Sequence, residues 1–323
     1  QLYLEHVKVL TDQEKSTIQY NVKSGIERLK SFLQRDGGFG YWPGYHDTSD
    51  PWGTTYAGHF LLEAEVKGYY VPADLLKRWK KYQKNKALEW RSNKEYYNDD
   101  LMQAYRLYTL AMAGNAELAA MNRLREEGKM SVTASWMLAA AYAKAGQPEA
   151  ARKIVQNLST TINPYRELWY SYGSHLRDKA LIMETLTLLG DQAKAFIVLE
   201  EISKALSNQN YWMSTQETAY CLKAVGAFIA RNKRGDLKFS YTINGKSVTT
   251  STELPIAQVP IAVTGTSKQS VKIENESGGT LFTRIILTGT PAQGQEEDAE
   301  SDLGLSIQYT DTKGNPMDPT RLE

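Results

Sequence analysis

The alternation of two kinds of helical segment constrains this chain more than any other feature. Over residues 16–230, segments with one apolar face alternate with segments that are apolar on nearly every side, at intervals of about 33 to 46 residues. A helix that is apolar all round must be buried, so each such segment needs amphipathic neighbours to cover it. The spacing predicts amphipathic outer helices over 16–35, 72–90, 115–127, 147–160 and 191–207, with inner partners that begin near Trp52, Asp99, Ser131, Asp178 and Ser214.

Turn signals fall between the expected helices. Glycine stands where paired helices need a turn, at Gly114-Asn115, Gly128, Gly146-Gln-Pro and Gly190-Asp191. A repeat of this kind fits an open solenoid, which needs a polar repeat at each end, or a closed toroid, which does not. The apolar segment from Leu2 to Leu10 is expected to be the tail of one more inner helix, but the periodicity leaves both geometries open.

The sequence pattern changes after about residue 235. Residues 237–243 alternate with period two, and Asn244-Gly245 is a strong hairpin signal. Further strand-like runs cover 257–263, 271–274 and 281–287, so we expect about four strands. An acidic stretch over 291–302 follows, and another strand is expected to begin near residue 303.

The stretch from Asp36 to Ala64 combines a helix end, an aromatic loop and a helix start. Gly37 and Gly38 end the first helical pattern, and Asp50-Pro51 opens the next, with Asp50 as the capping acceptor and proline in the first turn. The rings of the stretch between them are Phe39, Tyr41, Trp42, Tyr45 and Trp52. So many rings in one loop predict that it folds onto the rest of the protein.

Two motifs resemble the thioester domain of alpha-2-macroglobulins and complement components, in particular the bacterial type. The first is Phe32-Leu-Gln-Arg-Asp-Gly-Gly-Phe-Gly followed by Gly53-Thr-Thr-Tyr-Ala-Gly-His-Phe-Leu, and the second is Trp212-Met-Ser-Thr-Gln-Glu-Thr-Ala-Tyr-Cys-Leu-Lys-Ala-Val. Asp-Gly-Gly-Phe-Gly also resembles repeats of terpene cyclases and prenyltransferases, which share the helical toroid. The order and separation of the two motifs favour the macroglobulin family.

This resemblance implies a mainly α fold. It is an α/α toroid of the six-hairpin type with the first hairpin truncated, followed by a partial antiparallel β-sandwich. The toroid would cover 1–232, the returning half of a CUB-like or macroglobulin-like sandwich 236–290, an acidic linker 291–302, and the start of a following β domain 303–323. The chain is therefore expected to be a fragment of a longer protein.

The family's chemistry implies a protease trap. In members with an active trap, Gly-Cys-x-Glu-Gln forms an internal thioester, which stays dry until a protease cuts a bait segment and is then attacked by a lysine of that protease. The chain contains no such motif, and the resemblance of Gln1-Leu-Tyr-Leu to the segment that follows it predicts the motif upstream of Gln1. His46 stands near the place of a histidine that assists transfer to hydroxyls in complement members, so it is the candidate catalytic residue; alternatively, it is a partly exposed loop histidine.

The resemblance also implies partners and a location. The expected partners are target proteases and the rest of the same macroglobulin chain, and the expected location is the periplasm, the cell envelope or the exterior. A net charge of +1, with acidic and basic residues interspersed, gives no reason to expect nucleic acid. The longest apolar stretch, of about ten residues, falls short of the roughly 20 that span a bilayer.

No cofactor and no metal site are expected from the sequence. The chain has 4 histidines, and none of them shows His-x-x-x-His or cysteine spacing. Cys221 has no partner for an internal disulfide, and its apolar surroundings indicate a small core residue.

Two other functions remain open at this point. The first is a glycoside hydrolase or polysaccharide lyase on the same toroid, with Asp47 and Asp50 or Asp99 and Asp100 as a carboxylate pair. Helix capping is the simpler interpretation of both pairs. The second is a non-reactive macroglobulin relative that serves as a structural or partner-binding module.

Overall fold

The computed structural model describes most of the 323 residues. The described residues are 1–44, 48–92, 99–168, 170–208, 212–232, 236–262 and 270–278, and beyond these 281, 283–287, 289, 304 and 306–318. The chain divides into two compact units, Gln1–Gly279 and Thr280–Glu323. The helices and the sheet both lie in the first unit.

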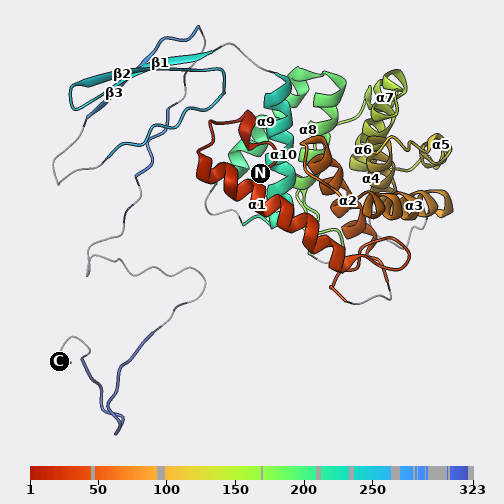
Figure 1. The fold of residues 1–323 in the computed structure, drawn as a ribbon, viewed down its shortest axis with the longest axis horizontal. Coiled ribbons are helices and arrows are strands. Elements are labelled where there is room, and N and C mark those ends of the chain that lie inside the picture. The colour runs from red at the N-terminus through yellow and green to blue at the C-terminus, as the bar shows by residue number, and fades with distance from the viewer. Residues whose placement is uncertain are drawn as a thin grey trace. The chain divides into compact units, whose positions relative to one another are not determined.

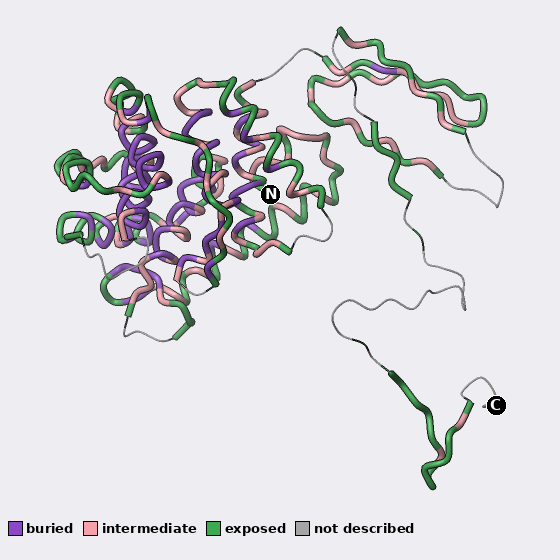
Figure 2. Tube along the Cα trace, turned by 180° about the vertical axis from the view of Figure 1, so that it is seen from behind, coloured by how far each residue is buried: buried purple, intermediate pink, exposed green. Residues whose placement is uncertain are grey.

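Ten α-helices in the described residues alternate between outer and inner positions, as the sequence predicts (Figure 1). The outer helices are α1 (Asp12–Leu29), α3 (Ala73–Glu89), α5 (Leu118–Glu126), α7 (Pro148–Val155) and α9 (Gln192–Ser207). The inner helices are α2 (Pro51–Val66), α4 (Asp99–Met112), α6 (Val132–Lys144), α8 (His175–Leu189) and α10 (Thr215–Arg231). Burial concentrates on the inner helices, and in α6 every residue from Thr133 to Tyr142 is buried (Figure 2).

Capping groups explain where the observed helix ends differ from the expected ones. Helix α1 begins at Asp12 because Thr11 and Glu14 form a capping box ahead of it. Helix α8 begins at His175, three residues before the expected Asp178, because the Ser174 side chain accepts from the Arg177 amide. After α1, a short 3-10 helix (Lys30–Phe32) leads to Gly37, whose φ of +96° is the left-handed conformation expected there.

The inner helices form a closed ring. Helix α2 packs on α4, α4 on α6, α6 on α8, and α8 on α10. Helix α10 returns to α2 through three successive contacts along the two helices: Trp52 Nε1 donates to Gln216 Oε1 at 3.2 Å, the rings of Tyr56 and Tyr220 lie 5.5 Å apart, and Lys223 Nζ lies 3.3 Å from Glu63 Oε1. These contacts select the closed geometry that the periodicity left open.

The N-terminal segment supports this closure. Residues Leu4–His6 form a short 3-10 helix that packs on α10, where the sequence indicated the tail of a longer inner helix. The Tyr3 hydroxyl donates to Glu63 Oε2 on α2 at 2.6 Å. Tyr3 also lies close to α10: a Cβ added at Gly226 would lie 2.7 Å from Tyr3 Cβ, so the close approach of Tyr3 to α10 requires glycine at this position.

The β region is a three-stranded antiparallel sheet with strand order β2-β1-β3. Strand β1 (Leu237–Ile243) pairs with β2 (Lys246–Thr252) through the predicted Asn244-Gly245 turn, and with β3 (Val271–Asn275) on its other edge. The sequence predicted more strands than form. Residues 257–262 and 283–287 are not strands, and within the described residues no strand pairs with them; Ile285 and Leu287 are exposed.

The second unit contains one isolated bridge among its described residues, between Thr310 and Pro316. The strand expected to begin near residue 303 is reduced to this bridge in the part that the structure describes. The domain boundaries inferred from the sequence stay predictions. Within the described ranges, no helix combines the length and the apolar character needed to cross a membrane.

The contact between α2 and α3 gives a test of the packing. A Cβ at Gly58 would lie 2.0 Å from Cε2 of Trp79. The Trp79 ring is fully buried, so the surrounding core leaves it no space to move away. We expect Gly58→Ala to lower the free energy of unfolding by at least 1 to 3 kcal/mol, roughly the cost of overpacking a core. Gly25→Ala on α1 is the control, because its Cβ would meet only Phe60 at 3.5 Å, and it should be neutral or stabilising by up to about 1 kcal/mol. Equal effects in urea unfolding would contradict the packing described.

Candidate functional site

The loop between α1 and α2 is attached to the start of α2 by hydrogen bonds. The Phe39 amide donates to Thr54 Oγ1 at 2.8 Å, and the Asp50 amide donates to the Phe39 carbonyl at 2.8 Å. Asp50 caps α2 by accepting from the Gly53 amide, as the sequence predicts. Of the loop's rings, Phe39 and Trp52 are buried, whereas Tyr41 and Trp42 are largely exposed.

The predicted catalytic residue His46 lies outside the described residues, as do its neighbours Tyr45 and Asp47. Its role stays a prediction. The described parts of the loop on either side are held together by the Asp36 carboxylate, which accepts from the Ser49 hydroxyl at 2.6 Å and from the Gly38 amide at 3.0 Å. Described residues on the two sides of the segment that carries His46 are therefore joined next to the start of an inner helix.

Polar contacts join the starts of neighbouring inner helices. The Ser131 amide before α6 donates to Asp100 of α4, Thr133 of α6 to Asp178 of α8, Ser174 before α8 to Glu217 of α10, and Trp52 of α2 to Gln216 of α10. Four of the five junctions of the ring thus carry a hydrogen bond at the helix starts. At the fifth, the rings of Trp52 and Tyr105 lie 5.1 Å apart.

A buried arginine lies in this belt of helix starts. Arg177 is fully buried; its Nε donates to Asp178 Oδ1 at 2.7 Å and its guanidinium lies 4.6 Å from the centre of the Trp52 ring. The Tyr165 hydroxyl donates to Asp178 Oδ2 at 2.8 Å. Burial by itself lowers the pKa of Arg177, but the Asp178 carboxylate outweighs burial and raises it, so the guanidinium stays charged.

A cavity of about 260 Å³ opens beside these groups. It is lined by Leu101, Ser131, Val132, Thr133, Ile162, Asn163, Pro164, Tyr165 and Asp178. Thr133 and Tyr165 both donate to Asp178 Oδ2 there, and the bond from Thr133 stabilises the junction of α6 and α8.

The carboxylates considered for a glycosidase have structural roles in the described chain. Asp50 is a helix cap, Asp99 Oδ2 accepts from Trp90 Nε1 at 3.0 Å, and Asp100 accepts from the Leu101 and Ser131 amides. The capping interpretation is confirmed for Asp50, whereas Asp99 and Asp100 lie inside the first turn of α4 and accept from the groups just named. Cys221 is also a core residue: it is fully buried, and burial raises the pKa of its thiol to about 12, which leaves it a poor nucleophile.

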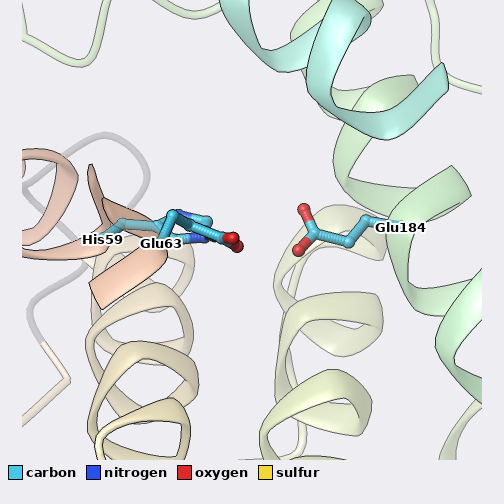
Figure 3. A group of neighbouring side chains, drawn as sticks. All are labelled: His59, Glu63 and Glu184. Atoms are coloured by element: carbon cyan, nitrogen blue, oxygen red, sulfur yellow. Dashed lines mark ion pairs between the residues drawn. The ribbon is translucent and has the colours of Figure 1, made fainter. Parts of the chain in front are cut away.

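A second polar centre lies further along the inner helices, and we call it the ionic cluster: His59, Glu63, Glu184 and Lys223. His59 and Glu63 come from successive turns of α2, Glu184 from α8 and Lys223 from α10, and the two carboxylates face each other (Figure 3). Lys223 Nζ lies 2.5 Å from Glu184 Oε1 and 3.3 Å from Glu63 Oε1. His59 Nε2 lies 3.4 Å from Glu63 Oε1.

Burial and neighbouring charges fix the protonation states of the ionic cluster. Burial lowers the pKa of His59, and the Lys223 ammonium lowers it further, so the imidazole is neutral. Burial raises the pKa of Glu63 and of Glu184, but the close contact with His59 and the charge of Lys223 outweigh burial for Glu63, and the charge of Lys223 does so for Glu184, so both pKa values are lowered. Burial lowers the pKa of Lys223, and the two carboxylates outweigh that effect and raise it.

The sequence reasoning missed the ionic cluster. The histidine and cysteine spacings gave no sign of it, although His59 and Glu63 stand four residues apart and therefore share one face of α2. No sequence signal links that face to Glu184 and Lys223. They join it because the ring brings α8 and α10 to α2.

Comparison with known proteins identifies the relatives of this fold. No protein-family model matches the chain. Alpha-2-macroglobulin of Escherichia coli is 29% identical over 211 residues, which are 61% of this chain and 12% of that protein. The alpha-2-macroglobulin homolog of Yersinia pestis and alpha-2-macroglobulin of Rickettsia conorii are each 22% identical over 98% of the chain and 16% and 17% of their own lengths. The chain is a relative of bacterial alpha-2-macroglobulins.

Solved structures agree on the fold. Native E. coli alpha-2-macroglobulin, from domain MG7 to the C-terminus, matches with a TM-score of 0.59 and 22% identity over 83% of this chain and 40% of that one. Salmonella alpha-2-macroglobulin reacted with methylamine matches with a TM-score of 0.59 and 20% identity over 83% of this chain and 17% of that one. The expected fold class and the resemblance to bacterial macroglobulins are confirmed. The chain spans less than a fifth of the length of these curated relatives.

The Arg177–Asp178 pair gives a test of the belt. We expect Asp178→Asn to lower the free energy of unfolding by about 3 to 5 kcal/mol, because it leaves the Arg177 guanidinium buried without its counter-charge. Asp12→Asn is the matched control, since Asp12 is also in the first turn of a helix but its side chain is fully exposed. The control should cost less than about 1 kcal/mol. If chemical denaturation gave equal decreases in the free energy of unfolding for the two variants, the Arg177–Asp178 pair would not stabilise the helix starts.

Proposed function

We propose that this chain is the thioester-domain region of a bacterial alpha-2-macroglobulin-like protease trap, an endopeptidase inhibitor rather than an enzyme. The observation that carries the proposal is the sequence similarity to E. coli alpha-2-macroglobulin, 29% over 211 residues. The neighbours in structure include E. coli alpha-2-macroglobulin activated by trypsin and by porcine elastase, and the Salmonella protein reacted with methylamine. Activation by proteases and reaction with methylamine are the behaviour expected of a trap that is triggered by proteolysis and carries an amine-reactive bond.

In the proposed mechanism, the reactive bond is a thioester from a Cys-x-Glu-Gln motif upstream of Gln1. Proteolysis elsewhere in the longer protein would expose it, and a lysine of the protease would attack its carbonyl once water is no longer excluded. The acyl group then passes from sulfur to nitrogen, and the cysteine leaves as the thiol. The described chain would contribute a rigid ring whose helix starts support the loop 36–50.

Within that loop, His46 is the residue for which we propose a catalytic part. A neutral imidazole can take the acyl group from sulfur or remove a proton from the attacking group. The hydrogen bonds of Asp36 and Phe39 to the two sides of the loop fix where its ends lie. We place the protein in the periplasm, the cell envelope or the exterior, with target proteases and the rest of its own chain as partners.

A labelled-methylamine experiment tests where the reactive bond lies. We expect the 323-residue chain to incorporate no methylamine, because its one cysteine, Cys221, is buried and is followed by Leu222-Lys223 rather than by Glu-Gln. The longer protein that contains the upstream motif should incorporate one label, which peptide mapping should locate upstream of Gln1. A label on the isolated chain, or none on the longer protein, would contradict the proposal; the second result would favour a non-reactive structural relative.

A second experiment tests His46 in the longer protein. If the longer protein is a trap, the trypsin that it captures should keep its activity toward small peptide substrates but lose its activity toward a large protein substrate. We expect His46→Ala to slow covalent capture of trypsin, measured on denaturing gels, by tenfold or more, in line with the loss of an acid–base group. Exposed-loop Tyr41→Ala is the control and should leave the rate unchanged. Equal rates for the two variants would make His46 an ordinary loop residue.

A further inference from the structure

The starting observation is an imidazole nitrogen with no hydrogen-bond partner in the protein interior. His59 is 3% exposed, and its Nε2 is buried without a hydrogen bond. Its other nitrogen, Nδ1, lies 2.8 Å from the Tyr105 hydroxyl. When Nδ1 carries the proton and donates to Tyr105, Nε2 has a free lone pair, and Glu63 Oε1 lies 3.4 Å from it. Figure 3 shows His59 beside Glu63, with Glu184 opposite them. Most buried polar atoms in proteins have a hydrogen-bond partner, so one without a partner needs an explanation.

The spacing of the donor atoms fits a metal ion. One ligand atom each from His59, Glu63 and Glu184 lie within 4.8 Å of one another. The 3.4 Å between His59 Nε2 and Glu63 Oε1 matches the edge of a tetrahedron, about 3.4 Å for bonds of about 2.1 Å. The nitrogen is too far from the oxygen for a good hydrogen bond and at the right distance for two ligands of one ion.

Each of the three side chains is also held by a tyrosine from another element. Tyr105 of α4 bonds His59, Tyr3 of the N-terminal segment donates to Glu63 at 2.6 Å, and Tyr108 of α4 donates to Glu184 at 2.5 Å. Metal ligands in proteins are oriented by such outer partners, which fix the histidine tautomer and the carboxylate rotamers. Three ligands oriented in this way form a built site rather than a chance acidic group.

Lys223 already provides one positive charge at this place. Its ammonium contacts both carboxylates, and the Lys223 side chain is 15% exposed, so its stem reaches the edge of the ionic cluster. A divalent ion together with the two carboxylates and a neutral imidazole would have no net charge. The ion and the ammonium therefore compete for the same oxygens, and binding of the ion requires Lys223 to leave them.

We propose that His59, Glu63 and Glu184 form a binding site for a divalent transition-metal ion of the zinc class, at which Lys223 is the exchangeable counter-cation. One imidazole nitrogen and two carboxylate oxygens favour zinc, cobalt or nickel over calcium and magnesium, which prefer oxygen alone. The ion would join α2 to α8 directly across the ring. This inference is independent of the protease trap, because it uses none of the loop that carries His46.

Titration of the purified, metal-free chain with Co²⁺ tests the site. We expect visible absorption typical of four-coordinate cobalt and its loss on addition of Zn²⁺. Lys223→Met should bind both ions at least tenfold more tightly, because the competing charge is gone. Tyr105→Phe should weaken binding by about 10- to 100-fold, as the loss of an outer partner does.

His59→Gln should abolish the cobalt spectrum, and His6→Gln, the change of a histidine outside the ionic cluster, should leave it intact. Circular dichroism checks that each variant folds, and if Lys223→Met does not fold, the comparison of the unaltered chain with His59→Gln decides by itself. No four-coordinate spectrum in the unaltered chain at millimolar cobalt, or a spectrum that survives His59→Gln, would overturn the proposal.

Discussion

The return of α10 to α2 is the contact on which the rest of the structure depends. Without this contact, the five inner helices would form an open superhelix. Its first and last inner helices would each lack a neighbour on one side, and their apolar faces would stay exposed. The Trp52–Gln216, Tyr56–Tyr220 and Glu63–Lys223 contacts remove those ends by joining the first inner helix to the last. Because the ring is closed, every inner helix has two inner neighbours and can be apolar on nearly all sides.

Closure also explains why polar groups occur in the interior. The inner helices run in the same direction, so equivalent turns of different helices meet at one level. At the level of the helix starts, capping groups and the Arg177–Asp178 pair satisfy one another. Two to three turns further on, the ionic cluster collects the charges of α2, α8 and α10. Between the two levels, the rings of Tyr56, Tyr105 and Tyr220 fill the space.

These two levels serve different purposes in the function that we propose. At the helix starts, hydrogen bonds of Phe39 and Asp36 hold the described parts of the loop on both sides of His46, the residue to which we assign a proposed catalytic part. The ionic cluster lies away from that end and contributes to ring closure, with or without a bound ion. The described chain thus combines a hydrogen-bonded belt of helix starts with a separate polar centre in its core.

Local sequence determined the helices, the hairpin and the family resemblance. Periodicity placed all ten helices because burial repeats with the helical turn, and Asp50 and Asn244-Gly245 were recognised because capping and tight turns depend on neighbouring residues alone. The resemblance drawn from the Asp-Gly-Gly-Phe-Gly and Trp212–Val225 motifs agrees with the relatives found. The sequence overestimated the strands, because 257–262 and 283–287 have strand-like residues but no strand beside them within the described part of the chain.

Only the tertiary structure decided that the repeat closes and which charges meet inside it. A pattern of one apolar face after another is the same in a solenoid and in a ring, since closure depends on the angle between successive helix pairs. For the same reason, nothing in the sequence connects Glu63 with Glu184 and Lys223, which lie 121 and 160 positions further along the chain. Local chemistry determined where each helix begins and ends, and the geometry of the ring determined which buried side chains became partners.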